Sequence, residues 1–167
     1  EFPGEGRKLL AFADSRQSAA YFAPYLESTY RRLLERRLIW KSLLDIYKDT
    51  QRSVSFQRLS NQMVINGNAS RIFEKNMDQD DRQSLVDLWL SRELVAFDTR
   101  QSLEGLGMIK YSIYFPDGTC FPEKFLESNL SSEEIQSLIN TLLNFTRKQM
   151  GISFPLGVNP ANEIFSP

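Results

Sequence analysis

Apolar residues recur at helical intervals through a long stretch of this sequence, from Ser15 to about Lys48. Their spacing is mostly three, four or seven residues, which places them on one face of an α-helix. This pattern predicts a helix that buries one face against its neighbours. Pro24 lies inside the stretch, and because proline lacks the amide hydrogen of a helix interior, we expect it to kink or divide the helix. The apolar positions are Phe22, Leu26, Leu33, Leu34, Leu38, Leu43, Leu44 and Tyr47.

Two further helices are predicted in the middle of the chain. Ser55 offers a hydroxyl to cap a helix that runs through Ile65, and the run Asn66-Gly67-Asn68 is expected to end it. Asp80 and Asp81 favour the start of the next helix, because the helix dipole attracts negative charge there. The residues that this helix is expected to bury are Leu85, Leu88, Trp89 and Val95.

Capping motifs predict two more helices. Asp98-Thr99-Arg100-Gln101 has the form of an N-cap followed by a polar third residue, and it opens a short helix that ends at Gly105 or Gly107. Ser131-Ser132-Glu133-Glu134 is a capping box, and the helix that it opens should end near Gly151. The fold class predicted by these patterns is mainly α, with a helical bundle-like arrangement.

Two short segments are expected to be strands. Residues 8–13 form an apolar run that is typical of a buried strand in a parallel sheet. Residues 108–115 are rich in β-branched and aromatic side chains, and Pro116-Asp117-Gly118 is a turn sequence, so we expect a short β-hairpin near 108–121. The order of elements from Asp80 to Phe121 has the outline of a winged-helix unit. Both a winged helix and a plain packing module stay open.

The sequence has no histidine and one cysteine, Cys120. This composition removes Ser-His-Asp and Cys-His catalysis, an internal disulfide and nearly every zinc site. A single cysteine favours a reducing, cytoplasmic setting. No stretch reaches the roughly 18 uninterrupted apolar residues of a membrane span, so no membrane partner is expected. The net charge is −1, so any nucleic-acid contact must come from a local basic patch.

Residues 6–27 contain the run Leu9-Leu10-Ala11-Phe12-Ala13-Asp14-Ser15-Arg16-Gln17-Ser18-Ala19-Ala20. This run resembles the first strand and first helix of the second RecA-like domain in large superfamily 2 DEAD/DEAH-box ATP-dependent helicases. The resemblance is to the bacterial type that carries a helical insertion after this helix. It is clear over these residues and fainter elsewhere, as at Asp98–Gly107. An Asp-Ser-Arg-Gln run directly after an apolar strand is uncommon, which makes the motif fairly specific.

The resemblance implies that the chain is a piece of a longer protein. Residues 1–29 would begin the second motor domain, residues 30–151 would form the helical insertion, and residues 152–167 would lead back to the rest. The sequence lacks a phosphate-binding loop, an Asp-Glu-Ala-Asp/His run and a late arginine motif, so the fragment alone is not expected to be an enzyme. ATP and Mg²⁺ would bind the missing motor domains of the parent protein, with no cofactor in the fragment itself. The implied partner is nucleic acid, with DNA favoured over RNA.

The junction after the predicted strand at 8–13 is the first candidate contact with a nucleic-acid backbone. Ser15, Arg16 and Gln17 would place a hydroxyl, a guanidinium and backbone N–H groups at a helix N-terminus, which suits a phosphate. The resemblance implies a phosphate of the nucleic acid at this place. In the alternative interpretation Asp14 and Ser15 only cap the helix, and Arg16 and Gln17 bond neighbouring carbonyls.

The second candidate lies between Tyr30 and Arg58, where eight basic residues face three acidic ones. Arg32, Arg36 and Trp40 are spaced four residues apart and share one helix face, which can bind phosphates and stack a base. In the alternative interpretation this face is simply solvated, its charge is paired by the acids nearby, and Trp40 packs in the core.

Two functions from different classes follow. The first is a non-catalytic fragment of an ATP-dependent helicase or translocase that lines the nucleic-acid path or braces the motor lobes. The second is a helical interaction or scaffolding module without a nucleic-acid role. A solvent-exposed basic face from Arg32 to Trp40 would favour the first, and its burial the second. A dimer formed through the unpaired edges of the strand at 8–13 would be an artefact of the fragment.

Overall fold

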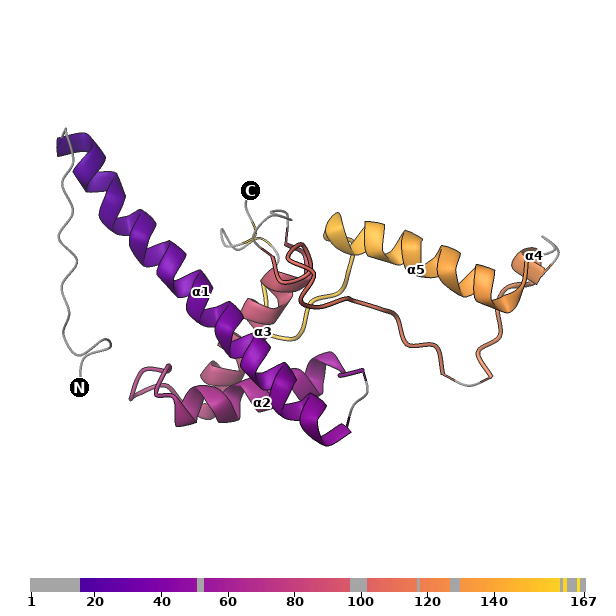
Figure 1. Ribbon diagram of the computed structural model, residues 1–167, viewed down its shortest axis with the longest axis horizontal. Coiled ribbons are helices and arrows are strands. Elements are labelled where there is room, and N and C mark those ends of the chain that lie inside the picture. Colours follow the sequence, from indigo (N-terminus) through magenta and orange to yellow (C-terminus); the bar gives the residue numbers. More distant parts are fainter. Residues whose placement is uncertain are drawn as a thin grey trace. The chain divides into compact units, whose positions relative to one another are not determined.

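The structure, a computed structural model, describes residues 16–50, 53–96, 102–116, 118–126, 130–159, 161 and 165 (Figure 1). For residues 16–21, 23, 50, 124 and 126 it describes the backbone alone. Within these ranges the chain is mainly helical, as predicted, and no β-strand is present. The predicted strand at 8–13 lies outside the described residues.

The chain divides into two compact units, Glu1–Arg37 and Leu38–Pro167. The helix α1, Arg16–Thr50, begins in the first unit and ends in the second. Pro24 lies inside α1, so of the two expected outcomes, a kink or a division, the division into two helices does not occur. Proline removes one backbone hydrogen bond, and the alanine, leucine and arginine residues around it favour the helix on both sides. The domain boundaries implied by the resemblance, after residues 29 and 151, stay predictions.

The helix α2, Phe56–Ala69, begins at its predicted cap but ends later than predicted. The Arg58 amide donates to Ser55 Oγ at 3.4 Å. The run Asn66-Gly67-Asn68 was expected to end the helix, and it continues it instead. One reason is that Asn66 Nδ2 donates to Asp45 Oδ2 of α1 at 3.0 Å, which holds this turn against α1. Tertiary contact therefore overrides the local preference of asparagine and glycine for a helix end.

Gly67 continues α2 because its missing side chain makes room for an aromatic ring. A Cβ at this position would stand 2.4 Å from a ring carbon of Phe73. Phe73 in turn stacks on Trp89, with ring centroids 6.2 Å apart and ring planes 11° from parallel. Trp89 belongs to α3, Gln79–Leu94, which packs against α2. Glycine at position 67 thus serves close packing, a role that its sequence neighbours do not reveal.

Arg71 follows α2 in the left-handed backbone conformation, with φ of 53°. Its amide donates to the Asn68 carbonyl at 3.1 Å, and the Ile72 amide donates to the Gly67 carbonyl at 3.0 Å, an arrangement in which glycine is preferred. We expect Arg71→Gly to raise the free energy of unfolding by about 0.5–1 kcal/mol, because glycine has no Cβ to strain this conformation. Urea unfolding followed by circular dichroism measures the change. Arg71→Ala removes the side chain but keeps Cβ, and equal stability of the two variants would contradict the prediction.

The main hydrophobic core lies between the C-terminal part of α1, α2 and α3. A second, smaller cluster contains Val95, Val158 and Phe165. Trp89 and Val95 are buried as predicted, and Leu85 and Leu88 are half-buried against the two clusters. The buried members of the main core are Leu38, Ile39, Met63, Val64, Val86, Trp89, Leu90 and Leu103.

Polar side chains also meet in this interior. The Ser60 hydroxyl of α2 donates to Asp87 Oδ1 of α3, and Gln83 Nε2 donates to both Ser60 Oγ and, at 3.2 Å, Asp87 Oδ1. Ser60 and Asp87 are buried, and buried polar groups require such partners because they have lost their hydrogen bonds to water. The three side chains link α2 to α3.

Two helices lie in the last third of the chain, α4, Glu123–Leu126, and α5, Ser132–Lys148. The predicted capping box of α5 is confirmed. The Glu134 amide donates to Ser131 Oγ at 3.2 Å, and the Ser131 amide donates to Glu134 Oε2 at 2.8 Å. These hydrogen bonds lower the pKa of the Glu134 carboxyl below its ordinary value. The helix ends at Lys148, three residues before the predicted stop at Gly151.

Arg147 anchors the last turn of α5 as a buried cation. Its Nη2 lies 2.9 Å from both carboxylate oxygens of Glu104, and its Nη1 donates to the Leu94 carbonyl. The guanidinium carbon lies 4.4 Å from the centre of the Tyr111 ring. Burial, and after it the charge of Glu93, raises the pKa of the Tyr111 phenol above its ordinary value. This cluster joins α5 to the end of α3 and to the segment between them.

The segment between α3 and α5 corrects two predictions. Residues 102–107 form turns rather than the later part of the predicted short helix, whose capping residues Asp98–Gln101 lie outside the described residues. The turn of the predicted hairpin forms, since the Thr119 amide donates to the Pro116 carbonyl at 3.1 Å. However, the extended residues 110–115 pair with no strand among the described residues, because they lie against α5, where the Ile113 amide donates to Asn140 Oδ1 at 2.9 Å. The hairpin ladder and the winged helix that requires it are therefore absent from the described part.

Candidate nucleic-acid interface

Four arginines lie close together in the first compact unit, on α1: Arg31, Arg32, Arg36 and Arg37, here called the arginine segment. The helical turn brings each of them within one turn of another member. Arg31, Arg32 and Arg37 are exposed, and Arg36 is half-buried. Binding to the phosphates of a nucleic acid usually requires several positive side chains close together, and this stretch of helix supplies them.

Two members of the arginine segment, Arg32 and Arg37, have no acidic partner among the described residues. Arg31 Nη2 lies 3.0 Å from Glu27 Oε1, but both side chains are exposed, and ion pairs in water contribute little. Within the described part of the chain, Arg32 and Arg37 form no ion pair. Asp45, which we expected to pair with this charge, lies 3.5 Å from Lys48 and also accepts from Asn66. Arg32 and Arg37 therefore present positive charge to solvent.

Exposed aromatic rings accompany the arginines. Tyr25 is 64% exposed and Tyr30 is 56% exposed, and both belong to the same unit as the arginine segment. Aromatic rings beside cations can stack nucleic-acid bases while the cations contact phosphates. Tyr30 precedes Arg31 directly, and Tyr25 lies about two helical turns before Arg32.

The residues predicted to contact nucleic acid differ in how far the structure describes them. Ser15 lies outside the described residues, and Arg16 and Gln17 form the first turn of α1 without a described side chain. Trp40 is half-buried, in the second unit. A role for these six residues in binding stays a prediction.

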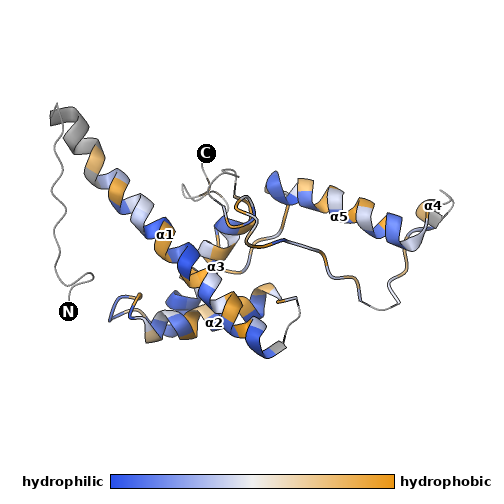
Figure 2. Ribbon diagram, in the orientation of Figure 1, coloured by the Kyte–Doolittle hydropathy of each residue, from blue (hydrophilic) through white to orange (hydrophobic). Residues whose placement is uncertain are grey.

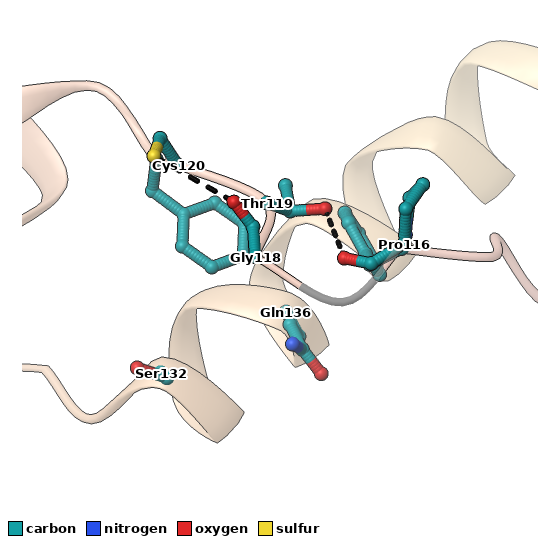
Figure 3. Close-up of a pocket in the computed structure, with 8 residues that line it drawn as sticks. Pro116, Gly118, Thr119, Cys120, Ser132 and Gln136 are labelled. Carbon is teal, nitrogen blue, oxygen red and sulfur yellow. Dashed lines mark hydrogen bonds between the residues drawn. The ribbon is translucent and has the colours of Figure 1, made fainter.

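A pocket of about 400 Å³ lies beside the start of α5 (Figure 3). Ser132 and Gln136 of α5 line it together with the turn that carries Thr119 and Cys120. The Cys120 thiol is exposed and lies 3.6 Å from the Gly118 carbonyl oxygen. Among the described residues that line the pocket, none is basic.

The described ranges contain no group of three histidine, cysteine, aspartate or glutamate residues placed to hold a metal ion. Among the described helices, none has the length and apolar character needed to cross a bilayer.

The chain was compared with protein-family models, curated proteins and solved structures, and none of them matches it. The interpretation of the arginine segment therefore depends on its own geometry and residue chemistry.

Proposed function

We propose that this chain is a non-catalytic part of an ATP-dependent helicase or translocase and that α1 contributes to the path of the nucleic acid. The helicase assignment rests on the resemblance of residues 6–27, and it places ATP hydrolysis in domains outside this chain. The contribution to nucleic-acid binding rests on the described residues. In this proposal the chain supplies phosphate and base contacts or braces the motor lobes, and it carries out no reaction itself.

The observation that carries the binding proposal is the exposure of Arg32 and Arg37 on the same helix as the exposed Tyr25 and Tyr30. A solvated structural helix usually balances its charges with acids one turn away. Here the exposed arginines outnumber their acidic partners, which favours a negatively charged ligand. DNA is the proposed ligand, and the comparison with RNA belongs to the test.

Binding is tested by fluorescence anisotropy with a labelled single strand and a labelled duplex of DNA, and the same two forms of RNA, over a range of salt. We expect Arg32→Ala/Arg36→Ala/Arg37→Ala to weaken binding at low salt. For the single strand it should also reduce the slope of log K against log salt by about 2, because each lost phosphate contact removes about 0.7. Alanine favours helix, so α1 should persist, and circular dichroism verifies this.

The matched control removes the same charge elsewhere. Arg58, Arg71 and Lys75 are exposed and lie in the second unit, so Arg58→Ala/Arg71→Ala/Lys75→Ala has the same net charge as the test variant. This control should bind nearly as the unaltered chain does. Equal weakening of both variants would indicate general charge attraction, and no binding at low salt would remove the nucleic-acid role.

The second candidate function, a helical protein-interaction module, is favoured by a different observation. Hydrophobic and hydrophilic residues alternate along α5 (Figure 2), yet Leu138, Leu142 and Phe145 are exposed to solvent. These three residues are spaced four and three apart and lie on one helix face. If the chain binds no nucleic acid, this face makes the interaction module the better explanation.

A further inference from the structure

The extended residues 110–115 form an unpaired strand-like edge in the second unit. Tyr111, Ile113 and Phe115 are half-buried, whereas Lys110, Ser112 and Tyr114 are exposed, Tyr114 by 78%. This alternation has the period of two residues that is characteristic of a β-strand. The side chains therefore already have a buried and a solvent side, although the backbone belongs to no sheet.

The backbone of this segment has one occupied edge and one open edge. In an extended chain the N–H and C=O groups of successive residues point to opposite edges. The Ile113 amide bonds Asn140 of α5, so residues 111, 113 and 115 direct their backbone groups to the occupied edge. Residues 110, 112 and 114 direct theirs to the other edge, where no hydrogen bond to another described residue is present. Open edges of this kind accept a further strand.

We propose that this open edge pairs with the same edge of a second copy of the chain, in an antiparallel ribbon centred on Ser112. In that register Ser112 faces Ser112 of the other copy and Lys110 faces Tyr114. Tyr111 faces Ile113, which is an aromatic and β-branched pair of the kind that stabilises antiparallel strands. The only charged side chain of the segment never faces its own copy, so the register brings no like charges together.

The arrangement also limits how many copies associate. Both copies use the same edge, so a two-fold axis closes the contact. Asn140 of α5 occupies part of the opposite edge in each copy, which prevents a third strand from extending the ribbon. A dimer rather than an open fibre is the expected assembly. This inference is independent of the proposed function, since it involves no residue of the arginine segment.

Sedimentation velocity of the 167-residue chain over a concentration series tests the pairing. We expect a reversible monomer–dimer equilibrium, which Ser112→Ala leaves unchanged. Ser112→Pro removes the amide hydrogen from both central hydrogen bonds and should weaken the dimer by about tenfold or more. Circular dichroism checks that the proline variant folds. A chain that stays monomeric, or a dimer that Ser112→Pro does not weaken, would overturn the proposal.

Cross-linking tests the register and does not depend on the proline variant. In a Cys120→Ser background, cysteine at position 112 would have its Cα about 5.5 Å from its counterpart, whereas cysteine at position 110 would be about 14 Å from its own, four residues away along the strands. A short bis-maleimide should link Ser112→Cys chains efficiently and Lys110→Cys chains poorly. Equal linking of both, or linking at neither position, would contradict the proposed pairing.

Discussion

Arg147→Ala is expected to lower the free energy of unfolding by about 3–5 kcal/mol, the usual cost of breaking a buried ion pair from one side. The Arg147 side chain is 8% exposed, and it is the partner of both Glu104 carboxylate oxygens and of the Leu94 carbonyl. Alanine would leave the Leu94 carbonyl without its donor, would leave Glu104 with only the more exposed Lys148 beside it, and would uncover the Tyr111 ring. The loss should appear as a lower midpoint of urea unfolding, followed by circular dichroism.

Two variants show whether the geometry of Arg147 is responsible. Arg147→Lys keeps the charge but has one nitrogen, so it cannot reproduce the separate contacts of Nη2 with Glu104 and Nη1 with the Leu94 carbonyl, and it should recover only part of the stability. Lys148→Ala removes a more exposed cation that lies 3.7 Å from the same carboxylate, and it should cost less than about 1 kcal/mol. If Arg147→Ala were no more destabilising than Lys148→Ala, the buried cluster would not hold α5 to the rest of the second unit.

Trp89→Ala is also expected to lower the free energy of unfolding by about 3–5 kcal/mol, because it removes packing from the core. Trp89 is buried in the main core and stacks on Phe73, which itself covers Gly67. The truncation would leave a cavity between α2 and α3 and remove the support of the Phe73 ring. Urea unfolding gives the free energy, and the fluorescence of the remaining Trp40 reports on α1.

Trp40→Ala is the matched control for this change, because it truncates the other tryptophan. Trp40 is half-buried and is not a member of the main core, so its loss should cost clearly less than that of Trp89. Similar costs for the two variants would mean that α1 depends on Trp40 for packing. That result would also weaken the prediction that Trp40 is available to stack a base.

Local patterns predicted the helices better than they predicted where the helices end. The capping box at Ser131 and the buried side of α3 follow from residues close in sequence, and both are confirmed. The late end of α2 depends on Asn66 bonding Asp45 and on the Phe73 ring over Gly67, contacts that a local pattern does not contain. The hairpin prediction failed for a similar reason, since α5 lies where a second strand was expected.

The candidate site was accessible to sequence reasoning only in part. The positive charge around Arg32 and Arg36 could be read from the residues, and the exposure of Arg32 agrees with it. The exposure of Tyr25 and Tyr30 could not be predicted from the sequence, because an aromatic residue in a helical pattern is more often buried. The buried pairing of Arg147 with Glu104 joins residues 43 positions apart, which no local spacing indicates.

The bonds between Ser60, Gln83 and Asp87 have a consequence for how this sequence can evolve. A change at one of the three positions leaves a buried polar atom without its partner, which usually costs more than replacing the whole group by apolar residues. Selection should therefore remove single substitutions at these three positions, whereas simultaneous replacement of two or all three by apolar residues can be tolerated. In a collection of homologous sequences, positions 60, 83 and 87 should covary, and their correlated changes would mark the α2–α3 contact without any structure.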